Sequence, residues 1–388
     1  MRAPPVKPAD VVIIGGGVIG CSIAYHLARR APADRVVVLE REAALGMGST
    51  AKATGAIRSQ FSTAENIGLS RLSLPIYRRF EEETGYSVYF RPHGRLIVTG
   101  DAGTMDGLRA SVALQRSLGV PSRAVTPAQA LALVPQLRVD DLVGGSFCEE
   151  DGSAEPAAAV QGFASGARAR GAEIRCGQEA VGLRRNGARV DGVETRDGVL
   201  DAGTVVVAAG PWSAAVAGWA GLDVPARPFR RQVSVVAPIP ALDVELPLVT
   251  DADTGFYLHR TGHGDLLLGG TDKDSRPGVG SDVDWDVVER VLTAGARRVP
   301  CLAEARVRRS YAGVRALTPD YHPILGRVAG IEGLVLACGD NGKGFMHAPA
   351  IGLLLSELIV DGRATSLDLE PFRLERFAGP VRREANFF

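Results

Sequence analysis

Three glycines near the N-terminus, Gly15, Gly17 and Gly20, have the spacing of a turn that binds a pyrophosphate. Gly15 permits a tight turn, Gly17 lets the backbone approach the anion, and Gly20 lets a helix pack closely on a strand. The N-terminus of that helix favours an anion because of its free N–H groups and its dipole. Glu40 follows Gly20 at about the 20-residue distance expected for a carboxylate that accepts a hydrogen bond from a ribose hydroxyl. A carboxylate there disfavours a 2′-phosphorylated ribose, so the pattern predicts FAD or NAD rather than NADP.

A buried strand at 10–14, a helix and a second buried strand at 35–40 are expected to position these residues. This order is typical of a dinucleotide-binding βαβ unit. Residues 204–210 and 334–339 form further uncharged apolar runs, typical of strands buried in a parallel sheet. Residues 227–270 instead alternate, which indicates antiparallel strands. Because the two kinds of stretch alternate along the chain, we expect two domains, each assembled from non-contiguous segments.

Apolar residues at helical spacing, together with capping residues, predict the helices that surround these strands. A strand-like segment at 86–100 separates the first helix from the second. The expected helices are 64–84, 102–118, one that begins after Thr126-Pro127, 156–170, 285–298 and 349–361.

The composition of the 388 residues is that of an ordinary globular protein. Lys plus Arg and Asp plus Glu each number 44, so the charge balance favours neither nucleic acid nor an anionic membrane and leaves small molecules as the expected partners. The five cysteines are scattered and form no CxxC pair, which indicates small core residues in a reducing compartment, with no disulfide framework and no metal site. The uncharged run 11–28 could imitate a membrane span, but it fits the βαβ unit better. We therefore expect a cytoplasmic protein with no membrane span.

Several further segments, spread over nearly the whole chain, resemble motifs of the D-amino-acid oxidase superfamily of FAD-dependent enzymes. The most similar branch contains sarcosine oxidase β-subunits, dimethylglycine dehydrogenases and proline dehydrogenase β-subunits. The resemblance implies an α/β FAD-binding (Rossmann-like) domain, at 1–85, 150–225 and 318–388, interleaved with an α+β substrate domain built on an antiparallel sheet, at 86–149 and 226–317. The matching segments are 48–50, 55–61, 151–152 with Pro156, 207–212, 311–315 with 318–320, and 342–346 with 348–352.

The resemblance also implies a chemistry, the oxidation of a C–N bond by transfer of a hydride from the carbon beside an amine to the flavin, which leaves an imine. The substrate would be a small amino acid or N-alkyl amine, with secondary amino acids of the sarcosine or proline type favoured. The cofactor would be non-covalent FAD. Together with the glycine turn, the resemblance assigns FAD binding to Gly15, Gly17, Val18, Ile19, Gly20, Glu40, Arg41, Gly48, Ser49, Thr50, Ala56, Val181, Ala209, Gly210, Trp212, Gly339, Asn341, Gly342, Lys343, Gly344 and Phe345.

Five residues are candidates for the substrate site. Arg58 and Arg315 match family arginines that bind the substrate carboxylate, a task suited to the guanidinium fork, although each could instead form a structural ion pair. Lys343 stands where the β-subunits usually have His; it could neutralise the reduced flavin, hold a carboxylate, or lie in solvent. Tyr257 and His259, on the expected substrate sheet, either line the pocket or simply pack. His93 and His322, beside prolines, are interpreted as structural.

Three departures from the family pattern bear on flavin attachment and on the electron acceptor. Lys52 occupies the position of a flavin-linking histidine, and Gly313 that of a flavin-linking cysteine, so a covalent flavin is not expected. The strand 265–269 lacks the lysine that related oxidases place beside the flavin for reaction with oxygen, although Lys273 follows closely. This pattern favours a dehydrogenase or a slow oxidase.

Alternative functions remain open at this point. The acceptor could be oxygen or another electron acceptor, and the substrate could be a D-amino acid or glycine. A FAD monooxygenase would share the βαβ unit, and a FAD-carrying subunit would need partner chains in a hetero-oligomer, whereas an independent enzyme could be a homo-oligomer.

Overall fold

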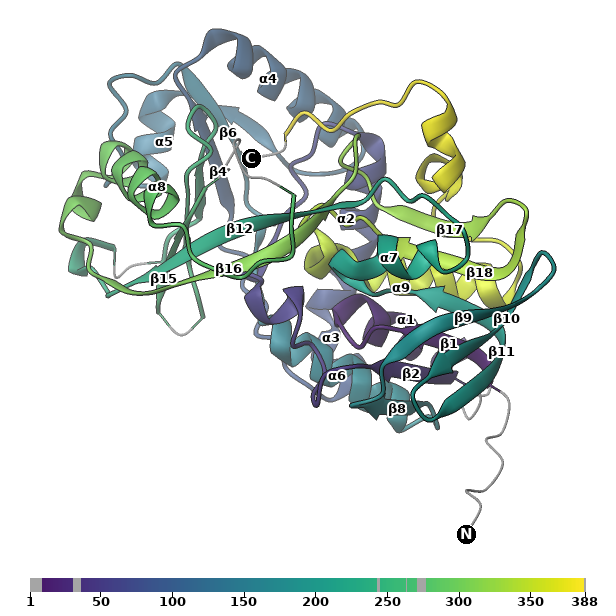
Figure 1. Cartoon of the computed structure of the whole chain (residues 1–388). Coiled ribbons are helices and arrows are strands. Elements are labelled where there is room, and N and C mark those ends of the chain that lie inside the picture. The colour runs from purple at the N-terminus through teal and green to yellow at the C-terminus, as the bar shows by residue number, and fades with distance from the viewer. Residues whose placement is uncertain (1–8, 31–35, 243–244, 263, 271–276, 387–388) are drawn as a thin grey trace.

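The chain folds around two large sheets in opposite halves of the molecule (Figure 1). Among the described residues each sheet has eight strands, and a separate two-stranded ladder joins β3 (Ala56–Ile57) to β7 (Gly152–Ser153). One sheet is built on parallel strands and the other is largely antiparallel, which confirms the predicted fold class. The computed structural model describes residues 9–30, 36–242, 245–262, 264–270 and 277–386.

The first sheet has a parallel core. Its strand order is β17-β18-β10-β11-β1-β2-β8, with β9 paired to β10. β1 pairs in parallel with β2 and β11, and β11 pairs in parallel with β18. Val and Ile predominate in these strands because both faces of such a sheet are covered. The strands are β1 (Ala9–Ile14), β2 (Val36–Glu40), β8 (Glu173–Cys176), β9 (Ala180–Asn186), β10 (Arg189–Thr195), β11 (Gly198–Val207), β17 (Ile324–Val328) and β18 (Ile331–Cys338).

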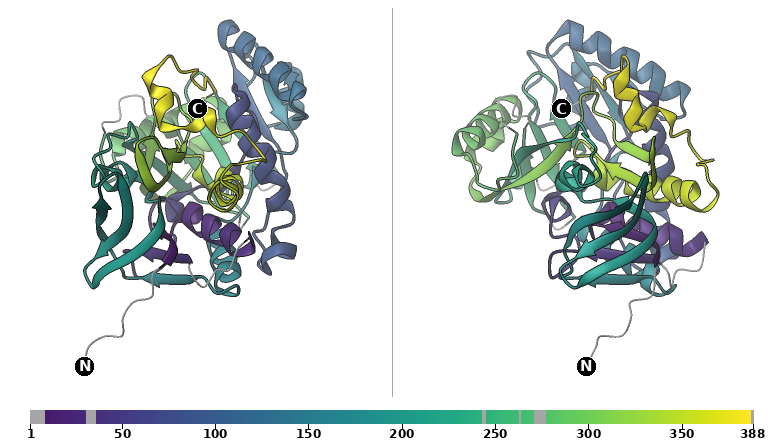
Figure 2. Two further views of the ribbon diagram at one scale, coloured as in Figure 1. Left: turned by 90° about the vertical axis from the view of Figure 1, so that its right-hand side faces the viewer. Right: turned by 45° about the vertical axis from the view of Figure 1, so that its right-hand side comes forward.

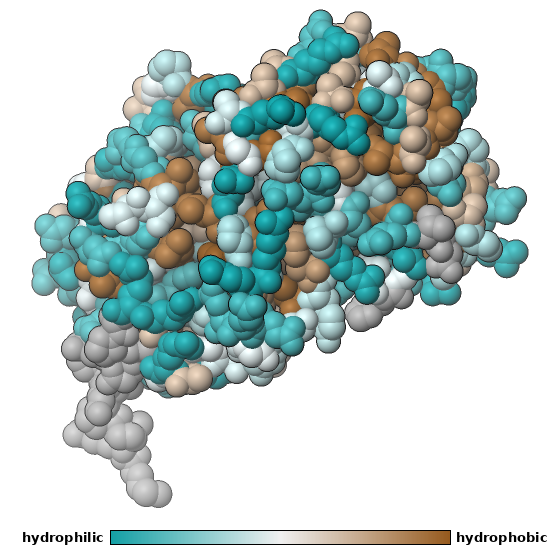
Figure 3. All heavy atoms as spheres, turned by 180° about the vertical axis from the view of Figure 1, so that it is seen from behind, coloured by the Kyte–Doolittle hydropathy of each residue, from teal (hydrophilic) through white to brown (hydrophobic). Residues whose placement is uncertain are grey.

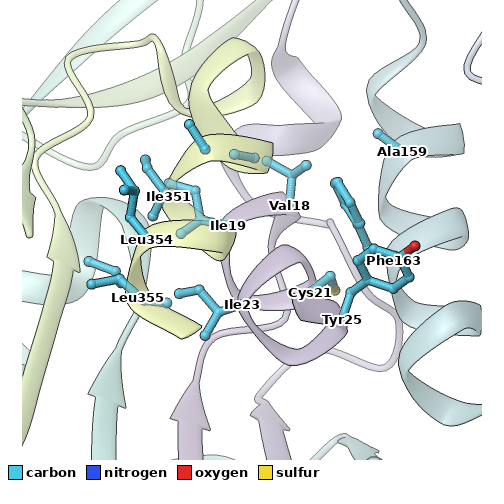
Figure 4. Close-up of a cluster of buried hydrophobic side chains, with 14 of the residues drawn as sticks. Val18, Ile19, Cys21, Ile23, Tyr25, Ala159, Phe163, Ile351, Leu354 and Leu355 are labelled. Carbon is cyan, nitrogen blue, oxygen red and sulfur yellow. The ribbon is translucent and has the colours of Figure 1, made fainter. Parts of the chain in front are cut away.

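Helices α1 (Val18–Arg30), α6 (Pro156–Arg168) and α9 (Gly344–Val360) cover one face of this sheet. Figure 4 shows apolar side chains of α1 between those of α6 and α9, with Tyr25 beside Phe163 and Ile23 beside Leu355. Although they come from opposite ends of the chain, α1 and α9 lie side by side (Figure 2). Next to α9 packs α2 (Ala64–Arg78), which α3 (Phe80–Thr84) follows. The opposite face carries a second apolar cluster, to which β9, β10 and α7 (Ser213–Gly218) contribute.

A glycine makes the contact between α1 and α9 close. A Cβ at Gly352 would lie 2.3 Å from Ser22 Oγ and 2.7 Å from the Ser22 carbonyl oxygen. The Ser22 hydroxyl also donates a 2.7 Å hydrogen bond to the carbonyl of Ala348. The packing of these two helices therefore depends on the absence of a side chain at residue 352.

The second sheet has the strand order β16-β12-β15-β14-β13-β4-β6-β5. Its pairs are antiparallel except for β13 with β4, which is parallel. All of its strands fall within 86–149 and 226–317, the segments predicted for the substrate domain; the domain limits themselves stay a prediction. The strands are β4 (Arg95–Thr99), β5 (Arg123–Val125), β6 (Gly144–Cys148), β12 (Arg227–Val236), β13 (Leu248–Asp251), β14 (Tyr257–Arg260), β15 (Leu266–Gly269) and β16 (Val307–Leu317).

Alternation along these strands separates a core face from a cavity face. Leu96, Leu258 and Leu268 point into an apolar cluster shared with α5 (Pro127–Leu133) and the segment after α8 (Trp285–Arg298). Their neighbours in sequence, including Arg95 and Tyr257, point the other way because successive strand residues face opposite sides of a sheet. The remaining helix of more than one turn beside this sheet, among the described residues, is α4 (Ala102–Ser117). Short 3₁₀ helices occur at Ser49–Lys52, Gly210–Trp212, Pro240–Leu242, Pro300–Glu304, Glu370–Phe372 and Leu374–Ala378.

Three of the predicted boundaries were wrong. The helix expected at 64–84 is interrupted at Arg79, which separates α2 from α3, and only 95–99 of the segment 86–100 forms a named strand. The last helix begins at Gly344 rather than at 349, so Pro349 lies inside it. A proline there has no N–H for the carbonyl of Phe345, and the Tyr77 hydroxyl donates to that carbonyl instead, at 2.5 Å.

The cysteines and the surface bear on two further expectations. All five cysteines are free, and Cys21, Cys148 and Cys338 are buried as predicted, but Cys176 is exposed and Cys301 is half-buried, so the prediction of core residues was wrong for these two. Hydrophilic residues are interspersed with apolar ones on the face seen from behind (Figure 3). Among the described residues, none of the helices has the length and apolarity that crossing a membrane requires.

The contact at Gly352 leads to the first prediction. Gly352→Ala should lower the melting temperature, because overpacking a tight core typically costs about 1–3 kcal/mol. Gly107→Ala is the matched control: Gly107 lies inside α4, nothing lies within 4 Å of the position that a Cβ would take there, and alanine should stabilise the helix by about 0.5–1 kcal/mol. Circular dichroism of both variants during heating measures the difference. Equal melting temperatures for Gly352→Ala and the parent protein would contradict the packing.

Candidate active site

A cavity of about 460 Å³ runs from the ends of β1 and β2 to one face of the second sheet. We call the part around Gly15, Gly17 and Glu40 the nucleotide end. The part around Arg58, Tyr257 and His259 is the sheet end, and Gly342 lies in the wall with the residues that follow β18. The cavity therefore joins the elements that the sequence predicted for cofactor and substrate.

The glycine turn has a distinct geometry at each position. A Cβ at Gly15 would lie 2.4 Å from the carbonyl oxygen of Ala208, and one at Gly20 would lie 1.9 Å from that of Gly15. Gly15 also has a φ of +114°, which glycine adopts without strain. At Gly17, by contrast, a Cβ would meet only Thr50 Oγ1, at 3.5 Å, and would point into open space. The backbone at Gly17 thus leaves room for a ligand, as predicted.

Glu40 is fixed in the wall of the nucleotide end by backbone donors. Its Oε2 accepts a 2.8 Å hydrogen bond from the N–H of Gly16, and its Oε1 accepts one of 2.9 Å from the N–H of Glu42. Each carboxylate oxygen has a second lone pair, so the side chain can still accept from a ligand hydroxyl.

Two predicted cofactor residues stack on each other beside the cavity. The Arg41 guanidinium lies 4.0 Å from the centre of the Trp212 ring, and both side chains line the nucleotide end. Nearby, the Ser49 hydroxyl donates a 2.6 Å hydrogen bond to the carbonyl of Val314, and Thr50 Oγ1 accepts one of 3.2 Å from the N–H of Val18, the first residue of α1. The loop that follows β2 is therefore attached to α1 and to β16 of the second sheet.

Gly342 makes room for an arginine. A Cβ at this position would lie 2.4 Å from Arg315 Cδ, so the arginine side chain crosses directly over the glycine. Gly342 also donates a 3.0 Å hydrogen bond to Asp340, whose carboxyl pKa is raised by burial. Helix α9 begins two residues later, at Gly344, so its N-terminus lies in this part of the wall.

At the sheet end, Arg58 is the side chain best suited to binding an anion. Within the described part of the chain, no carboxylate lies within 4 Å of either its guanidinium or that of Arg315. Burial and the charge of Arg315 lower the pKa of Arg58 to about 10, so it stays cationic at neutral pH. Its guanidinium lies 4.8 Å from the centre of the Phe61 ring.

Tyr257 and His259 line the sheet end as neutral groups. Burial raises the pKa of the Tyr257 phenol, and burial together with the charge of His93 lowers the pKa of His259 to about 3. His259 Nδ1 is buried and has no hydrogen-bond partner among the described residues. A Cβ at Gly269, on β15, would lie only 2.1 Å from the Tyr257 hydroxyl. The Tyr257 ring therefore fits here because residue 269 is a glycine. Two polar groups thus face the cavity without adding charge.

The comparison with known proteins agrees with this geometry. The model of the family described as "FAD dependent oxidoreductase" matches residues 10–358. The chain belongs to this family of FAD-dependent oxidoreductases. The family assignment confirms the predicted superfamily, the predicted enzyme class and FAD as the cofactor.

Individual relatives match nearly the whole of this chain. Sarcosine dehydrogenase, mitochondrial, of Homo sapiens is 31% identical over 393 residues, which cover 96% of this chain and 42% of that protein. Sarcosine oxidase subunit beta of Rhizobium meliloti (strain 1021) is 31% identical over 382 residues, which cover 97% of this chain and 90% of that protein. The crystal structure of L-proline dehydrogenase from P. horikoshii aligns with a TM-score of 0.91 and 30% identity, covering 98% of this chain and 100% of that chain. The chain thus spans less than half of the human protein.

The residues present fit FAD. Gly17 leaves the backbone open, Glu40 offers acceptor oxygens, and the N-termini of α1 and α9 both reach the wall, where they favour anionic ligand groups. Most residues predicted for FAD line the cavity, and their individual contacts with FAD stay a prediction. Those that line it are Gly15, Gly17, Val18, Ile19, Glu40, Arg41, Gly48, Ser49, Thr50, Ala56, Ala209, Gly210, Trp212, Asn341, Gly342, Gly344 and Phe345.

Four predicted residues lie outside the lining. Gly20 and Gly339 are tightly packed, the latter with a Cβ position 2.5 Å from Thr318 Cγ2. Val181 is exposed, and its neighbour Ala180 lines the cavity instead, because β9 turns alternate residues outward. Lys343 is neither in solvent nor in the lining: it is 1% exposed, and its Nζ donates a 2.8 Å hydrogen bond to the carbonyl of Tyr321. Lys273, considered for reaction with oxygen, lies outside the described residues.

The interpretation of two histidines as structural agrees with their contacts. His93 Nε2 hydrogen-bonds with Ser153 Oγ at 2.9 Å, and His322 Nε2 hydrogen-bonds with Thr63 Oγ1 at 2.8 Å. His93 nevertheless lies beside the site, since its ring centre is 6.3 Å from that of His259.

Several lining residues were missed by the sequence analysis, chiefly Arg95, Arg231 and Thr250. Arg95 precedes the apolar run Leu96–Val98, and a charge at the start of a buried strand was the available signal. Lys52 also lines the cavity, where its Nζ lies 5.7 Å from the centre of the Tyr311 ring and its Cβ 2.7 Å from the Cβ position of Gly313. The two positions compared with flavin-linking residues are therefore adjacent in space.

The open space at Gly17 leads to a prediction about FAD retention. Gly17→Val should fold normally yet lose FAD, because its side chain would occupy the space required by the cofactor. Gly280→Val is the control, since none of the described residues lies within 4 Å of the Cβ position at residue 280, and Gly280 is not among the residues that line the cavity. The ratio of flavin absorbance to protein absorbance after purification measures retention. A Gly17→Val protein that keeps a full complement of FAD would contradict the placement.

Proposed function

We propose that the chain oxidises a small amino acid with a secondary amine, of the sarcosine or proline type, using non-covalent FAD. The observation that supports this most directly is the pair of cavity arginines, Arg58 and Arg315, with no protein carboxylate within 4 Å among the described residues. Guanidinium groups in a cavity wall are well suited to a carboxylate ligand, which both fits their fork and offsets their charge. The activities for which the relatives are named, on sarcosine and on proline, point to the same class of substrate.

The same charges favour a neutral substrate amine. A protonated amine would be repelled by Arg58 and Arg315 in a cavity that excludes much of the solvent, so its pKa should fall on binding. Tyr257 and the neutral His259 can hydrogen-bond with the amine or the carboxylate without adding charge. In this proposal the arginines orient the substrate and the two neutral groups complete its hydrogen bonds.

FAD, when bound, supplies the hydride acceptor for the carbon beside the nitrogen. The nucleotide end, with Gly17 and Glu40, would hold its pyrophosphate and ribose. The sheet end would then place the substrate carboxylate on Arg58 and Arg315 and leave the C–N bond between the carboxylate site and the middle of the cavity. Water could hydrolyse the resulting imine after release.

A FAD-carrying subunit of a hetero-oligomer is the second candidate. The chain covers 90% of a protein named as a subunit, which favours an enzyme completed by partner chains. Activity of the purified single chain would rule out a requirement for partners.

The proposed attachment of FAD can be tested separately. Acid precipitation of the purified protein should release the flavin into the supernatant, because Lys52 and Gly313 offer neither of the linking side chains found in relatives with covalent flavin. Absorbance of the supernatant and of the washed pellet gives the result. Yellow colour retained in the pellet would contradict non-covalent binding.

The proposed reaction predicts an anaerobic spectral change. Sarcosine, L-proline or a similar secondary amino acid should bleach the flavin absorbance, whereas NADPH should not. Arg58→Met should retain FAD but raise the substrate concentration for half-maximal bleaching roughly 100-fold. The variant loses a charge-assisted hydrogen bond and leaves the substrate carboxylate without this partner in the cavity. Arg109→Met, at an exposed arginine paired with Asp106, is the control.

Each outcome separates the alternatives. Bleaching by NADPH would indicate a monooxygenase. Bleaching only by D-amino acids or glycine would show that the substrate is a primary rather than a secondary amino acid. Unchanged half-maximal bleaching in Arg58→Met would remove this arginine from the carboxylate site.

A further inference from the structure

Arg95 is a further cation at the sheet end, buried and distinct from the pair assigned to the substrate carboxylate. It begins β4, lines the cavity and is only 4% exposed. Its Nη2 donates a 3.0 Å hydrogen bond to Thr250 Oγ1 on the neighbouring strand. Its Nη1 is buried and has no hydrogen-bond partner within the described part of the chain. A guanidinium with an unused donor in a cavity wall is suited to binding an anion.

Among the described residues, no carboxylate forms an ion pair with Arg95 within 4 Å. Asp151 is the carboxylate that raises the pKa of Arg95, and it does so from a greater distance than an ion pair. The oxygens of Asp151 instead accept from the N–H of Ser59 at 2.7 Å and from Gln60 Nε2 at 3.2 Å. Burial and the charge of Arg58 lower the pKa of Arg95 to about 9, so it is still cationic at neutral pH. A buried cation in this position is costly unless an anion binds to it.

A substrate with one carboxylate would leave this cation unused, since Arg58 and Arg315 already account for that group. We propose that Arg95 binds a second carboxylate, so that the substrate is a secondary amino acid with two acidic groups. The inference rests on the proposed function and narrows its substrate class. The planar fork of Arg95, with Nη1 still available, suits one carboxylate. Thr250 holds the guanidinium in place through Nη2.

Binding of unreactive analogues tests the inference without turnover. Thiodiacetate and (methylthio)acetate have a sulfur in place of the amine and differ only in the second carboxylate. Titrated against the FAD-loaded protein and followed by the change in flavin absorbance, thiodiacetate should bind at least about tenfold more tightly, as expected for one additional charged hydrogen bond. Equal affinity, or tighter binding of the monoacid, would overturn the inference.

Variants of Arg95 assign the preference to this residue. Arg95→Met should reduce the ratio of the two affinities to about one. Arg95→Lys keeps the charge but not the fork and should give an intermediate ratio. FAD content and circular dichroism check that each variant is folded, and if Arg95→Met does not fold, the ratio for Arg95→Lys decides. A variant that binds both ligands more weakly by the same factor would show a structural role and overturn the inference.

Turnover then separates this inference from the proposed function. Sarcosine has no second carboxylate. Iminodiacetate carries one on the nitrogen substituent, and N-methyl-L-aspartate carries one on the side chain. Faster bleaching by either diacid than by sarcosine supports the inference and shows which branch carries the second group. Bleaching by sarcosine in preference to both diacids would overturn the inference alone, whereas a flavin that no amine bleaches would overturn the proposed function.

Discussion

The close contact between Gly20 and the backbone of Gly15 is the constraint on which the cavity depends. A Cβ at Gly20 would lie 1.9 Å from the Gly15 carbonyl oxygen, so α1 can approach β1 only where no side chain intervenes. The contact directs the N-terminus of α1 at the nucleotide end. The other side of α1 packs on α9 through Gly352, and α9 begins beside Gly342 in the cavity wall. One helix therefore sets the nucleotide end and the middle of the cavity relative to each other.

The sheet end depends on a different rule, the alternation of side chains along strands. Leucines on one face of the second sheet form a core with the helices, which leaves the opposite face free to carry Arg95, Tyr257 and His259. These large polar side chains need space, and glycines provide it: Gly269 beneath the Tyr257 ring and Gly342 beneath Arg315. The large polar side chains of the site can thus take their positions because the residues beneath them are glycines, which have no side chain.

Local patterns in the sequence predicted the glycine turn and the position of Glu40, because these residues belong to one βαβ unit. Gly15, Gly17 and Gly20 have the geometry expected of them, and Glu40 ends β2 as expected. Arg95 was missed because its role arises only when β4 pairs with β13 and brings Thr250 to it. The alternative that Lys343 lies in solvent was wrong for a similar reason: the side chain is covered by Tyr321 and Phe61, which come from distant parts of the chain.

Lys343 shows how a buried residue outside the cavity can still act on it. Its Nζ lies 5.8 Å from the centre of the Phe61 ring, and the Arg58 guanidinium lies 4.8 Å from the same centre, so the ring is shared by a cation inside the cavity wall and one behind it. Burial and the charge of Arg58 lower the pKa of Lys343 to about 7. An anion bound at Arg58 would offset that charge and raise the pKa again, which favours protonated Lys343. The protonation of Lys343 is therefore linked to the presence of an anion bound at Arg58 in the cavity.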